Sequence, residues 1–442
     1  MTMPSRGDDP PIPPAPPAGG KTVQESDVAD PGQAAAGLAR IGWAERSMPV
    51  LGLIREAFER EQPFEGLAVA ACLHVTAETA VLAKLVTAGG GRLDLAASNP
   101  LSTQDDIAAA LAASPGITVH ARSGVDRRTY YAHIHRALDA APGLVVDDGC
   151  DLVNTLHTER SELLAGVRGG CESTTTGVLR LRRMAADGTL AFPMVAADAS
   201  RTRRMFDNFS GTGQSVIDGI IRATNTLLAG KVVVVAGYGP CGGGIAERAR
   251  GLGAQVIVTE VDPVRALDAL MQGFRVLPMA QAAPLGQVFI TATGSREVIA
   301  AEHMALMRDG AILANAGHFD VEVDVRALAD LAVAVHPAVR PHADEYLLAD
   351  GRRLILLAEG RVVNLVAAEG NPAAVMDLSF GVQALALAWL ADGGGELRPG
   401  VHEVPAEIDA RIATLALATL GAQIDTLTAV QEKYLDSWRY GS

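Results

Sequence analysis

The stretch VVVVAGYGPCGGGIAERARGLGAQVIVTEVD, residues 232–262, carries the strongest structural signal in the chain. An apolar β-branched run leads into a glycine-rich turn that begins at Gly237, a helical pattern follows, and a second apolar run ends at Glu260. This order of strand, turn, helix and strand is typical of a dinucleotide-binding unit and is far more specific than an isolated GxGxxG. We therefore predict a Rossmann-type nucleotide domain.

The turn supplies what a dinucleotide needs. Gly237 allows the tight turn, Gly239 lets the backbone approach a pyrophosphate, and Gly242 lets the helix pack close to the strand. The start of the helix offers free N–H groups and the positive end of its dipole to the phosphates. Glu260, 23 residues after Gly237, is placed to accept hydrogen bonds from a ribose diol. Because a carboxylate there repels a 2′-phosphate, we expect NAD rather than NADP.

The composition limits the other possibilities. The 442 residues are 49% hydrophobic, which is enough for two or three domains with large cores. A net charge of −14 gives no electrostatic case for nucleic acid or an anionic membrane. The four cysteines form no CxxC pair and no zinc spacing, so we expect buried thiols, a reducing cytoplasm and no metal site. We find no signal-peptide pattern and no apolar run long enough to span a bilayer.

Strand-like and helix-like segments alternate from about Ala36 onward, which predicts parallel sheets covered by helices. Strands are expected at 66–73, 93–97, 117–120, 144–147, 288–292, 311–314 and 354–357, and helices at 76–88, 103–112, 129–139, 372–390 and 406–438. The expected fold is α/β, with two Rossmann-like doubly wound parallel-sheet domains and a small helical C-terminal segment. We divide the chain into a disordered proline-rich arm (1–30), a substrate domain (36–212, completed by 372–400), an NAD domain (213–371) and a helical dimerisation tail (401–442).

Polar residues cluster just after predicted strands, at 73–76, 99–105 and 147–151. In open α/β sheets ligands bind outside the carboxyl ends of the strands, so these clusters predict a substrate site. Residues 293–294 and 315–318 follow strands of the nucleotide domain and are expected to face the cofactor.

Many blocks of the sequence, in order, resemble S-adenosylhomocysteine hydrolases, from Ala36 almost to the C-terminus. They include LHVTAETAVL (73–82), NPLSTQD (99–105), VVDDGCD (145–151), TTTG (174–177), FDNFSGTGQS (206–215), TEVDP (259–263), NAGHFDVEVDV (315–325), LLAEGRVVNL (356–365) and VMDLSF (375–380). The resemblance is to the compact prokaryotic branch, which lacks the longer tail that reaches a neighbour's NAD.

The resemblance implies a reaction and an assembly. Such enzymes hold NAD tightly and oxidise the 3′-hydroxyl of an adenine nucleoside to a ketone for part of the cycle. The ketone makes the 4′ C–H acidic, so that the 5′ substituent can be eliminated. The family hydrolase releases homocysteine, adds water and returns the hydride. The family also implies a homotetramer built from close dimers.

The resemblance assigns roles to individual residues. His74 and Asp148 match the acid–base pair at the 5′ position, Asp207 the acid near the 3′-hydroxyl, and His318 the histidine of the cleft. Residues matching the substrate pocket are Thr76, Glu78, Thr79, Ser173, Asn371, Met376 and Phe380. Residues expected at the cofactor, besides the glycines and Glu260, are Thr174, Thr175, Thr176, Asn208, Asn315 and Asn364.

Three positions depart from the family pattern. Arg203 stands where the family has a lysine, Ser173 where it has a glutamate (Glu172 lies one residue earlier), and Asn371 where it has a histidine. An arginine cannot give up its proton to act as a base, so Asp207 becomes the candidate base at the 3′-hydroxyl, with Arg203 holding charge and orientation. Ser173 leaves a weaker partner and more room at the sugar, and Asn371 is expected to alter contacts on the adenine side.

These departures leave three hypotheses. The first hypothesis is a divergent paralogue that expels water from the 5′ carbon and gives a 4′,5′-unsaturated nucleoside. Such an enzyme would resemble the dehydratases of nucleoside-antibiotic pathways, for example the one that converts angustmycin C to angustmycin A. The second hypothesis is a true S-adenosylhomocysteine hydrolase that tolerates the changes. The third is an inactive NAD-binding regulatory homologue, against which the retained His74, Asp148, Asp207 and His318 argue.

Overall fold

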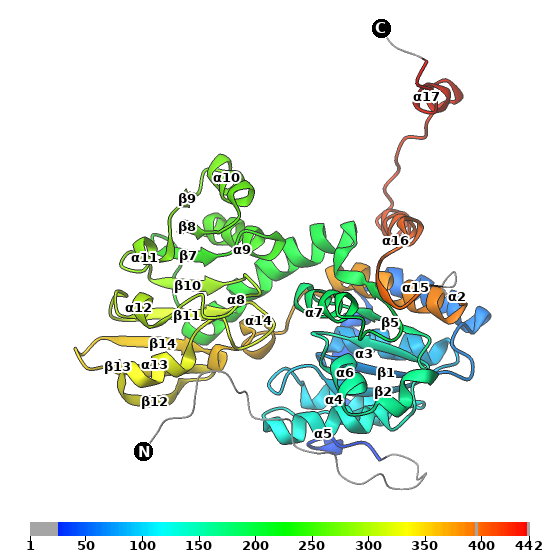
Figure 1. The fold of residues 1–442 in the computed structure, drawn as a ribbon, viewed down its shortest axis with the longest axis horizontal. Helices are drawn as coiled ribbons and strands as arrows, with labels where there is room; N and C mark the ends of the chain where they lie inside the picture. Colours follow the sequence, from blue (N-terminus) through cyan, green and yellow to red (C-terminus); the bar gives the residue numbers. More distant parts are fainter. Residues whose placement is uncertain (1–24, 394–396, 440–442) are drawn as a thin grey trace.

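The computed structural model describes residues 25–393 and 397–439, which form two lobes lying side by side (Figure 1). Each lobe is built on a mainly parallel β-sheet with helices packed on both faces. The predicted fold class is therefore confirmed. The first lobe appears in blue and cyan and the second in green and yellow, and the orange helix α15 returns the chain to the first lobe.

The first sheet has seven parallel strands in the order β15-β6-β5-β4-β1-β2-β3. They are β1 (Ala68–Leu73), β2 (Arg92–Ala97), β3 (Ile117–His120), β4 (Leu144–Asp147), β5 (Gly169–Glu172), β6 (Pro193–Ala196) and β15 (Gly400–Glu403). All six residues of β1 are buried, as expected of a strand covered on both faces. Alternate side chains enter opposite layers, so that Val69 and Ala71 pack in one core and Ala70 and Cys72 in the other.

Two helical layers cover this sheet. One face carries α1 (Ala34–Glu45), α2 (Pro49–Glu61), α3 (Ala77–Ala88), α4 (Asp105–Ala112) and α15 (Ala373–Ala391), and the other α5 (Arg127–Leu138), α6 (Asp151–Thr158), the short η2 (Ser161–Gly166) and α7 (Thr175–Ala186). Among the described helices, α15 alone is long and apolar enough by length and composition to cross a membrane. The sequence analysis did not identify this segment as a possible membrane span. In this fold most of that helix is buried against the first sheet.

The second sheet has eight strands in the order β12-β13-β14-β11-β10-β7-β8-β9. They are β7 (Val232–Ala236), β8 (Gln255–Thr259), β9 (Arg275–Val276), β10 (Val288–Thr291), β11 (Ala311–Asn315), β12 (Ala332–Arg340), β13 (Ala343–Leu348) and β14 (Arg353–Leu357). One face packs on α8 (Thr212–Thr224), α9 (Pro240–Gly251), α10 (Pro263–Met271) and α14 (Val363–Val366), and the other on α11 (Met279–Ala282), α12 (Ala301–Met304) and α13 (Val325–Leu331). The antiparallel edge hairpin β12–β13 was not predicted.

The chain crosses from the first lobe to the second through η3 (Ala197–Ala199) and η4 (Arg203–Gly211). The η4 segment is a π-helix, a rare wide-turn conformation that is frequently found at functional sites. It carries both Arg203 and Asp207, which are buried. The chain returns to the first lobe after η5 (Ala358–Gly360) and α14, through Gly370 to Pro372 at the start of α15.

Both ends of the chain differ from the sequence prediction. Residues 1–24 of the predicted disordered arm lie outside the described residues, but residues 25–30 are ordered: the backbone of Asp27 bridges to His120 at the sheet edge, and η1 (Pro31–Gln33) follows. The single C-terminal helix predicted over 406–438 is wrong. It is two helices, α16 (Ala406–Thr419) and α17 (Ala429–Leu435), because Gly421 adopts a left-handed φ of 66°.

Candidate active site

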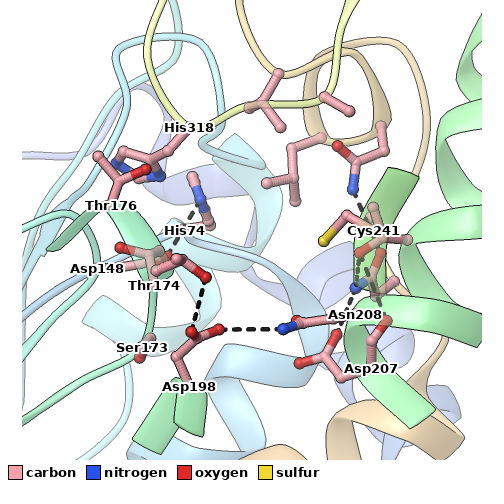
Figure 2. Close-up of a pocket in the computed structure, with 18 of the residues that line it drawn as sticks. His74, Asp148, Ser173, Thr174, Thr176, Asp198, Asp207, Asn208, Cys241 and His318 are labelled. Carbon is pink, nitrogen blue, oxygen red and sulfur yellow. Dashed lines mark hydrogen bonds and ion pairs between the residues drawn. The ribbon is translucent and has the colours of Figure 1, made fainter. Parts of the chain in front are cut away.

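A cavity of about 300 Å³ lies between the lobes and takes its lining from both (Figure 2). Its polar residues follow strands: His74 comes after β1, Asp148 after β4, and His318 after β11. The carboxyl ends of the two parallel sheets therefore meet at one place, where open α/β sheets bind ligands. Of the three predicted strand-end clusters, 73–76 and 147–151 reach the cavity, whereas no residue of 99–105 lines it.

His74 is held by a close contact with Asp148 at one ring nitrogen and by hydrogen bonds at the other. Its Nε2 lies 3.2 Å from Oδ2 of Asp148, and its Nδ1 lies 2.7 Å from Oγ of Ser102 and 3.2 Å from Oγ of Ser98. Burial lowers the pKa of His74 to about 4, against the opposing effect of the Asp148 carboxylate. The ring is therefore neutral near pH 7, and because a carboxylate can only accept, its proton belongs on Nε2, facing Asp148.

A charged pair, Arg203 and Asp207, lies within the π-helix, with Nε of Arg203 3.4 Å from Oδ2 of Asp207. Burial alone would lower the pKa of Arg203, but the carboxylates of Asp207 and Asp198 raise it above its ordinary value. The guanidinium therefore stays charged and cannot act as a base. Asp207 is fixed at both oxygens, since Oδ1 accepts from Asn371 (2.5 Å) and Oδ2 from Ser379 (2.7 Å).

Asn371 was expected to alter contacts on the adenine side, but its side chain contacts Asp207. Its amide nitrogen donates to Asp207 and to Thr212 (3.2 Å), while its oxygen accepts from Ser215 (2.6 Å) and Asn364 (3.3 Å). Asn371 thus links the proposed 3′ acid to the second lobe through four fixed hydrogen bonds.

Ser173 follows β5 and lines the cavity, where its hydroxyl accepts a hydrogen bond from Nε2 of Gln383. The preceding Glu172 does not replace the missing carboxylate, because Oε1 accepts from the backbone N–H groups of Gly149 (3.0 Å) and Thr174 (2.8 Å), away from Ser173. Burial, together with Asp147 and Asp148, raises the pKa of Glu172 well above its ordinary value.

The three consecutive threonines lie at the N-terminus of α7 and line the cavity, and the first two make different hydrogen bonds. Thr174 accepts from Gly177 as the N-cap, and Thr175 donates to Oδ2 of Asp198 (2.7 Å). Oδ1 of Asp198 accepts from Asn208 in the π-helix (3.1 Å). Asp198 therefore ties the threonine loop to the segment that joins the lobes.

The residues present fit a bound NAD. A Cβ on Gly237 (φ 94°) would collide with the carbonyl of Ala292, and one on Gly242 with the carbonyl of Gly237, so both positions require glycine. A Cβ on Gly239 would meet only Nη1 of Arg265, at an ordinary contact distance of 3.6 Å, and the uncapped N-terminus of α9 opens to the cavity. Oδ1 of Asn364 is buried without a partner in a residue that lines the cavity, so a ligand N–H has an acceptor there.

Four residues predicted at the cofactor stand behind the cavity wall: Gly237, Gly242, Glu260 and Asn315 do not line it. Glu260 closes the glycine turn by accepting from the N–H of Tyr238 (2.7 Å) and two further backbone N–H groups. Burial raises its pKa, but these hydrogen bonds outweigh burial and leave the pKa below its ordinary value. Asn315 bonds to the backbone of residues 317, 319 and 360, so it shapes the loop that carries His318.

His318, which belongs to the second lobe, contacts residues of the first lobe. Its ring centroid lies 5.5 Å from that of His74, and a Cβ on Gly149 would collide with its Nε2. Beside it, Phe319 stacks against the guanidinium of Arg180 at 5.5 Å. The ligand-type atoms of His74, Asp148 and His318 also lie within 4.8 Å of one another, although the sequence predicted no metal site.

The predicted adenine-side residues, Thr76, Glu78, Thr79, Met376 and Phe380, all line the same cavity. Asp198 and Gln383 are among the lining residues that sequence reasoning missed. Asp198 follows β6 as the other polar groups follow their strands, and Gln383 lies seven residues after Met376 and three after Phe380, on one face of α15. Both signals were present in the sequence.

Comparison with known proteins places this architecture in a family. The model "S-adenosyl-L-homocysteine hydrolase" matches residues 25–162, and "S-adenosyl-L-homocysteine hydrolase, NAD binding domain" matches residues 208–370. The adenosylhomocysteinase of Aquifex aeolicus is 55% identical over 95% of this chain and 100% of its own length, and that of Thermosynechococcus vestitus is 54% identical over 94% and 97%. Among solved structures, a dipicolinate synthase from Bacillus halodurans covers 74% of this chain and 99% of its own, with 15% identity and a TM-score of 0.47.

Identity above 50% over 94–95% of the chain and two family models together decide the assignment, and the glycine turn agrees with the cofactor that the NAD-binding-domain model names. NAD is therefore the cofactor, and the chain belongs to the S-adenosyl-L-homocysteine hydrolase family.

Proposed function

We propose that this chain oxidises the 3′-hydroxyl of an adenine nucleoside, removes the 4′ proton and expels the 5′ substituent. The observation that carries the proposal is the meeting of two separate pairs of ionisable side chains in one cavity: the neutral His74 with Asp148 on one side, and Arg203 with Asp207 on the other. Figure 2 shows His74, Asp148 and Asp207 in this cavity. A reaction that handles protons at two carbons of one sugar needs two such groups.

Bound NAD supplies the acceptor for the 3′ hydride and later its donor. At the 3′ carbon, the Asp207 carboxylate, aligned by Asn371 and Ser379, accepts the hydroxyl proton, while Arg203 stays charged and stabilises negative charge on the 3′ oxygen. At the other side, the neutral His74 and Asp148 exchange protons with the 4′ carbon and the 5′ leaving group.

S-adenosylhomocysteine is the substrate that the relatives favour. Two adenosylhomocysteinases are 54% and 55% identical to this chain over 94% and 95% of it, and the His74–Asp148 pair with its serine partners is complete here. Hydrolysis would release homocysteine, add water at the 5′ carbon and return the hydride to give adenosine.

A second candidate is loss of water from a 5′-hydroxyl to give a 4′,5′-unsaturated nucleoside with no net oxidation. One observation favours it: the three departures from the family pattern, Arg203, Ser173 and Asn371, all line this cavity, and two of them contact or pair with Asp207. The changes are therefore concentrated in this cavity rather than scattered over the fold.

Product analysis tests the proposal. The purified protein with its NAD is incubated separately with S-adenosylhomocysteine, adenosine and an adenine ketohexose nucleoside, while NADH absorbance is followed and products are identified by mass spectrometry. Homocysteine identifies the hydrolase, and a product lighter by one water identifies the dehydratase. If no nucleoside reduces the bound NAD at any stage, the proposal fails and an NAD-binding protein without turnover remains.

A further inference from the structure

Asp147 and Glu172 are two buried acids that lie next to each other just behind the cavity. They end the neighbouring parallel strands β4 and β5 as register partners, so their side chains leave the same face of the sheet. Both are 0% exposed, and neither lines the cavity, although the residues that follow them, Asp148 and Ser173, do. Two negative charges this close in a buried place repel each other strongly, so one of the two acids has to keep a proton.

The hydrogen bonds of the two acids differ. Both oxygens of Asp147 have donors, because Oδ1 accepts from the N–H of the next residue (2.9 Å) and Oδ2 from that of Val153 (2.8 Å). Glu172 has all of its donors on one oxygen: Oε1 accepts from the N–H of Gly149 (3.0 Å) and from the N–H (2.8 Å) and hydroxyl (2.9 Å) of Thr174. Its Oε2 is buried without a hydrogen-bond partner.

This difference indicates which acid holds the proton. An ionised carboxylate spreads its charge over both oxygens, so a buried one needs donors at both, as Asp147 has. A neutral carboxylic acid accepts mainly at its carbonyl oxygen, as Glu172 does, and an unpartnered hydroxyl at Oε2 costs less than an unpartnered charge there. Burial, together with Asp147 and Asp148, raises the pKa of Glu172, in agreement with this pattern.

Positive charge near Glu172 does not reverse the assignment. The ionisable side chains that act on it from the surrounding strands, turns and helices are Asp147, Asp148, Cys150, Cys171 and Arg203. Arg203, the cation among them, contacts Asp207 instead. The N-terminus of α7 also favours negative charge, and Glu172 packs against Gly177 in its first turn, but the N–H that reaches the carboxyl from this end meets Oε1 and not Oε2.

The accepting oxygen of Glu172 connects two turns in the cavity wall. Gly149 lies in the turn that carries Asp148, and Thr174 begins the threonine turn that is expected at the cofactor. A single oxygen therefore holds both turns in place. A negative charge on Glu172 would, in addition, repel the charge of Asp148.

We propose that Glu172 is a positioning residue that works as a neutral carboxylic acid: its carbonyl oxygen holds the Asp148 turn against the threonine turn, and its proton, carried on Oε2, keeps a second negative charge away from Asp148. The protonation state is a property of the folded chain alone. Its consequence for catalysis rests on the proposed function, because that function makes Asp148 a proton-handling group.

Infrared spectroscopy of the protein with its NAD tests the protonation state. A neutral carboxylic acid has a C=O stretching band that a carboxylate lacks. The protein is made by cell-free synthesis with glutamate that carries ¹³C in its side-chain carboxyl, so that a glutamate band is distinguished from an aspartate band. At pH 7 the difference between wild type and Glu172→Gln should contain an acid band that the label displaces. Glu56→Gln, which removes an exposed carboxylate, should change only carboxylate bands.

Two variants of Glu172 test the positioning role. Glu172→Gln keeps an accepting oxygen and stays neutral, whereas Glu172→Asp keeps the acid but is one methylene shorter and cannot reach both turns. The shorter acid should therefore lower kcat/KM for reduction of bound NAD by adenosine at least about tenfold more than the amide does. Retention of NAD after gel filtration should follow the same order, because the threonine turn lines the cavity. Glu56→Gln should match wild type, and the melting temperature shows whether each variant is folded.

The outcomes separate this inference from the proposed function. A difference spectrum for Glu172→Gln without an acid band, or with one that the label leaves in place, would show that Glu172 is ionised and would overturn the inference. Losses of activity and NAD in Glu172→Gln as severe as those in Glu172→Asp would overturn the positioning role. If wild type has the labelled acid band but neither adenosine nor S-adenosylhomocysteine reduces its NAD, the proposed function falls and the neutral acid stands, and NAD retention then decides the positioning role.

Discussion

The amide nitrogen of Asn371 lies 2.5 Å from Oδ1 of Asp207, joining residues 164 positions apart in the sequence. Asp207 lies in the π-helix through which the chain leaves the first lobe, and Asn371 lies where the chain returns to it. The two crossings between the lobes are thus tied together at the proposed 3′ acid. A change in the relative position of the two lobes will therefore alter the hydrogen bonding of this carboxylate.

Replacing Asp207 with asparagine should abolish oxidation of the nucleoside. The variant keeps the size of the side chain but loses the proton acceptor, so NADH formation should fall by about 10²–10⁴-fold. Stopped-flow absorbance of the bound cofactor measures this directly. Asp218→Asn, which removes an exposed carboxylate paired with Arg222, serves as the control and should behave as wild type. Unchanged NADH formation in Asp207→Asn would exclude Asp207 as the base.

Replacing Asn371 with aspartate should change the pH profile. Two carboxylates 2.5 Å apart cannot both be ionised easily, so the pair would retain a proton to higher pH. Because the reaction needs an ionised acceptor at Asp207, the acidic limb of kcat/KM should move up by about one pH unit or more. Asn371→Ser, whose new side chain cannot ionise, should lose activity without any shift of the acidic limb of kcat/KM. An acidic limb that stays in place would show that Asp207 does not set it.

Sequence reasoning succeeded where the determinants are local. The glycine turn at Gly237 and the acid at Glu260 belong to one strand–turn–helix–strand unit, and the strand-end rule placed His74 and Asp148 at the cavity. It failed where contacts are distant in sequence: nothing near Asn371 indicates that its partner is Asp207. The break after α16 was missed because the hydrophobic pattern continues through Gly421, and only the backbone conformation of that glycine ends the helix.

Stability should fall in mild acid partly because of His120. This residue is fully buried, both ring nitrogens lack partners, and burial, reinforced by Arg136 and His133, lowers its pKa to about 4. Its unfolded-state pKa is near 6.5, so as the pH falls the unfolded chain takes up the proton first. His120 therefore leaves stability unchanged above about pH 6.5 and destabilises the folded state progressively between pH 6.5 and 4.

Replacing His120 with phenylalanine tests this linkage. The free energy of unfolding should drop less between pH 7.5 and pH 5 than in wild type, by about 2 kcal/mol, because the variant cannot bind the proton in either state. Urea unfolding at the two pH values gives the difference. His336→Gln removes an exposed histidine and should leave the wild-type slope unchanged. Equal slopes for wild type and His120→Phe would contradict the assignment.

A methyl group at Gly149 should disturb the approach of the two lobes. The Cβ of an alanine there would collide with Nε2 of His318, beside the His74–Asp148 pair, so kcat/KM should fall at least about tenfold. Part of any loss of kcat/KM will come from backbone strain, because Gly149 has a φ of 110°, which alanine adopts only at a cost. Gly188→Ala provides the matched control, because Gly188 also has a positive φ (70°) but no atom near its missing Cβ.

A double-mutant cycle separates the collision from the backbone strain. His318→Ala removes the atom that the new methyl group would strike, so adding Gly149→Ala to this variant should cost clearly less than adding it to wild type. The loss of kcat/KM in the double variant should therefore be clearly smaller than the sum of the two single losses in free-energy terms. Additive losses would mean that the strain at residue 149 alone accounts for the effect, and that the glycine is not kept for the sake of His318.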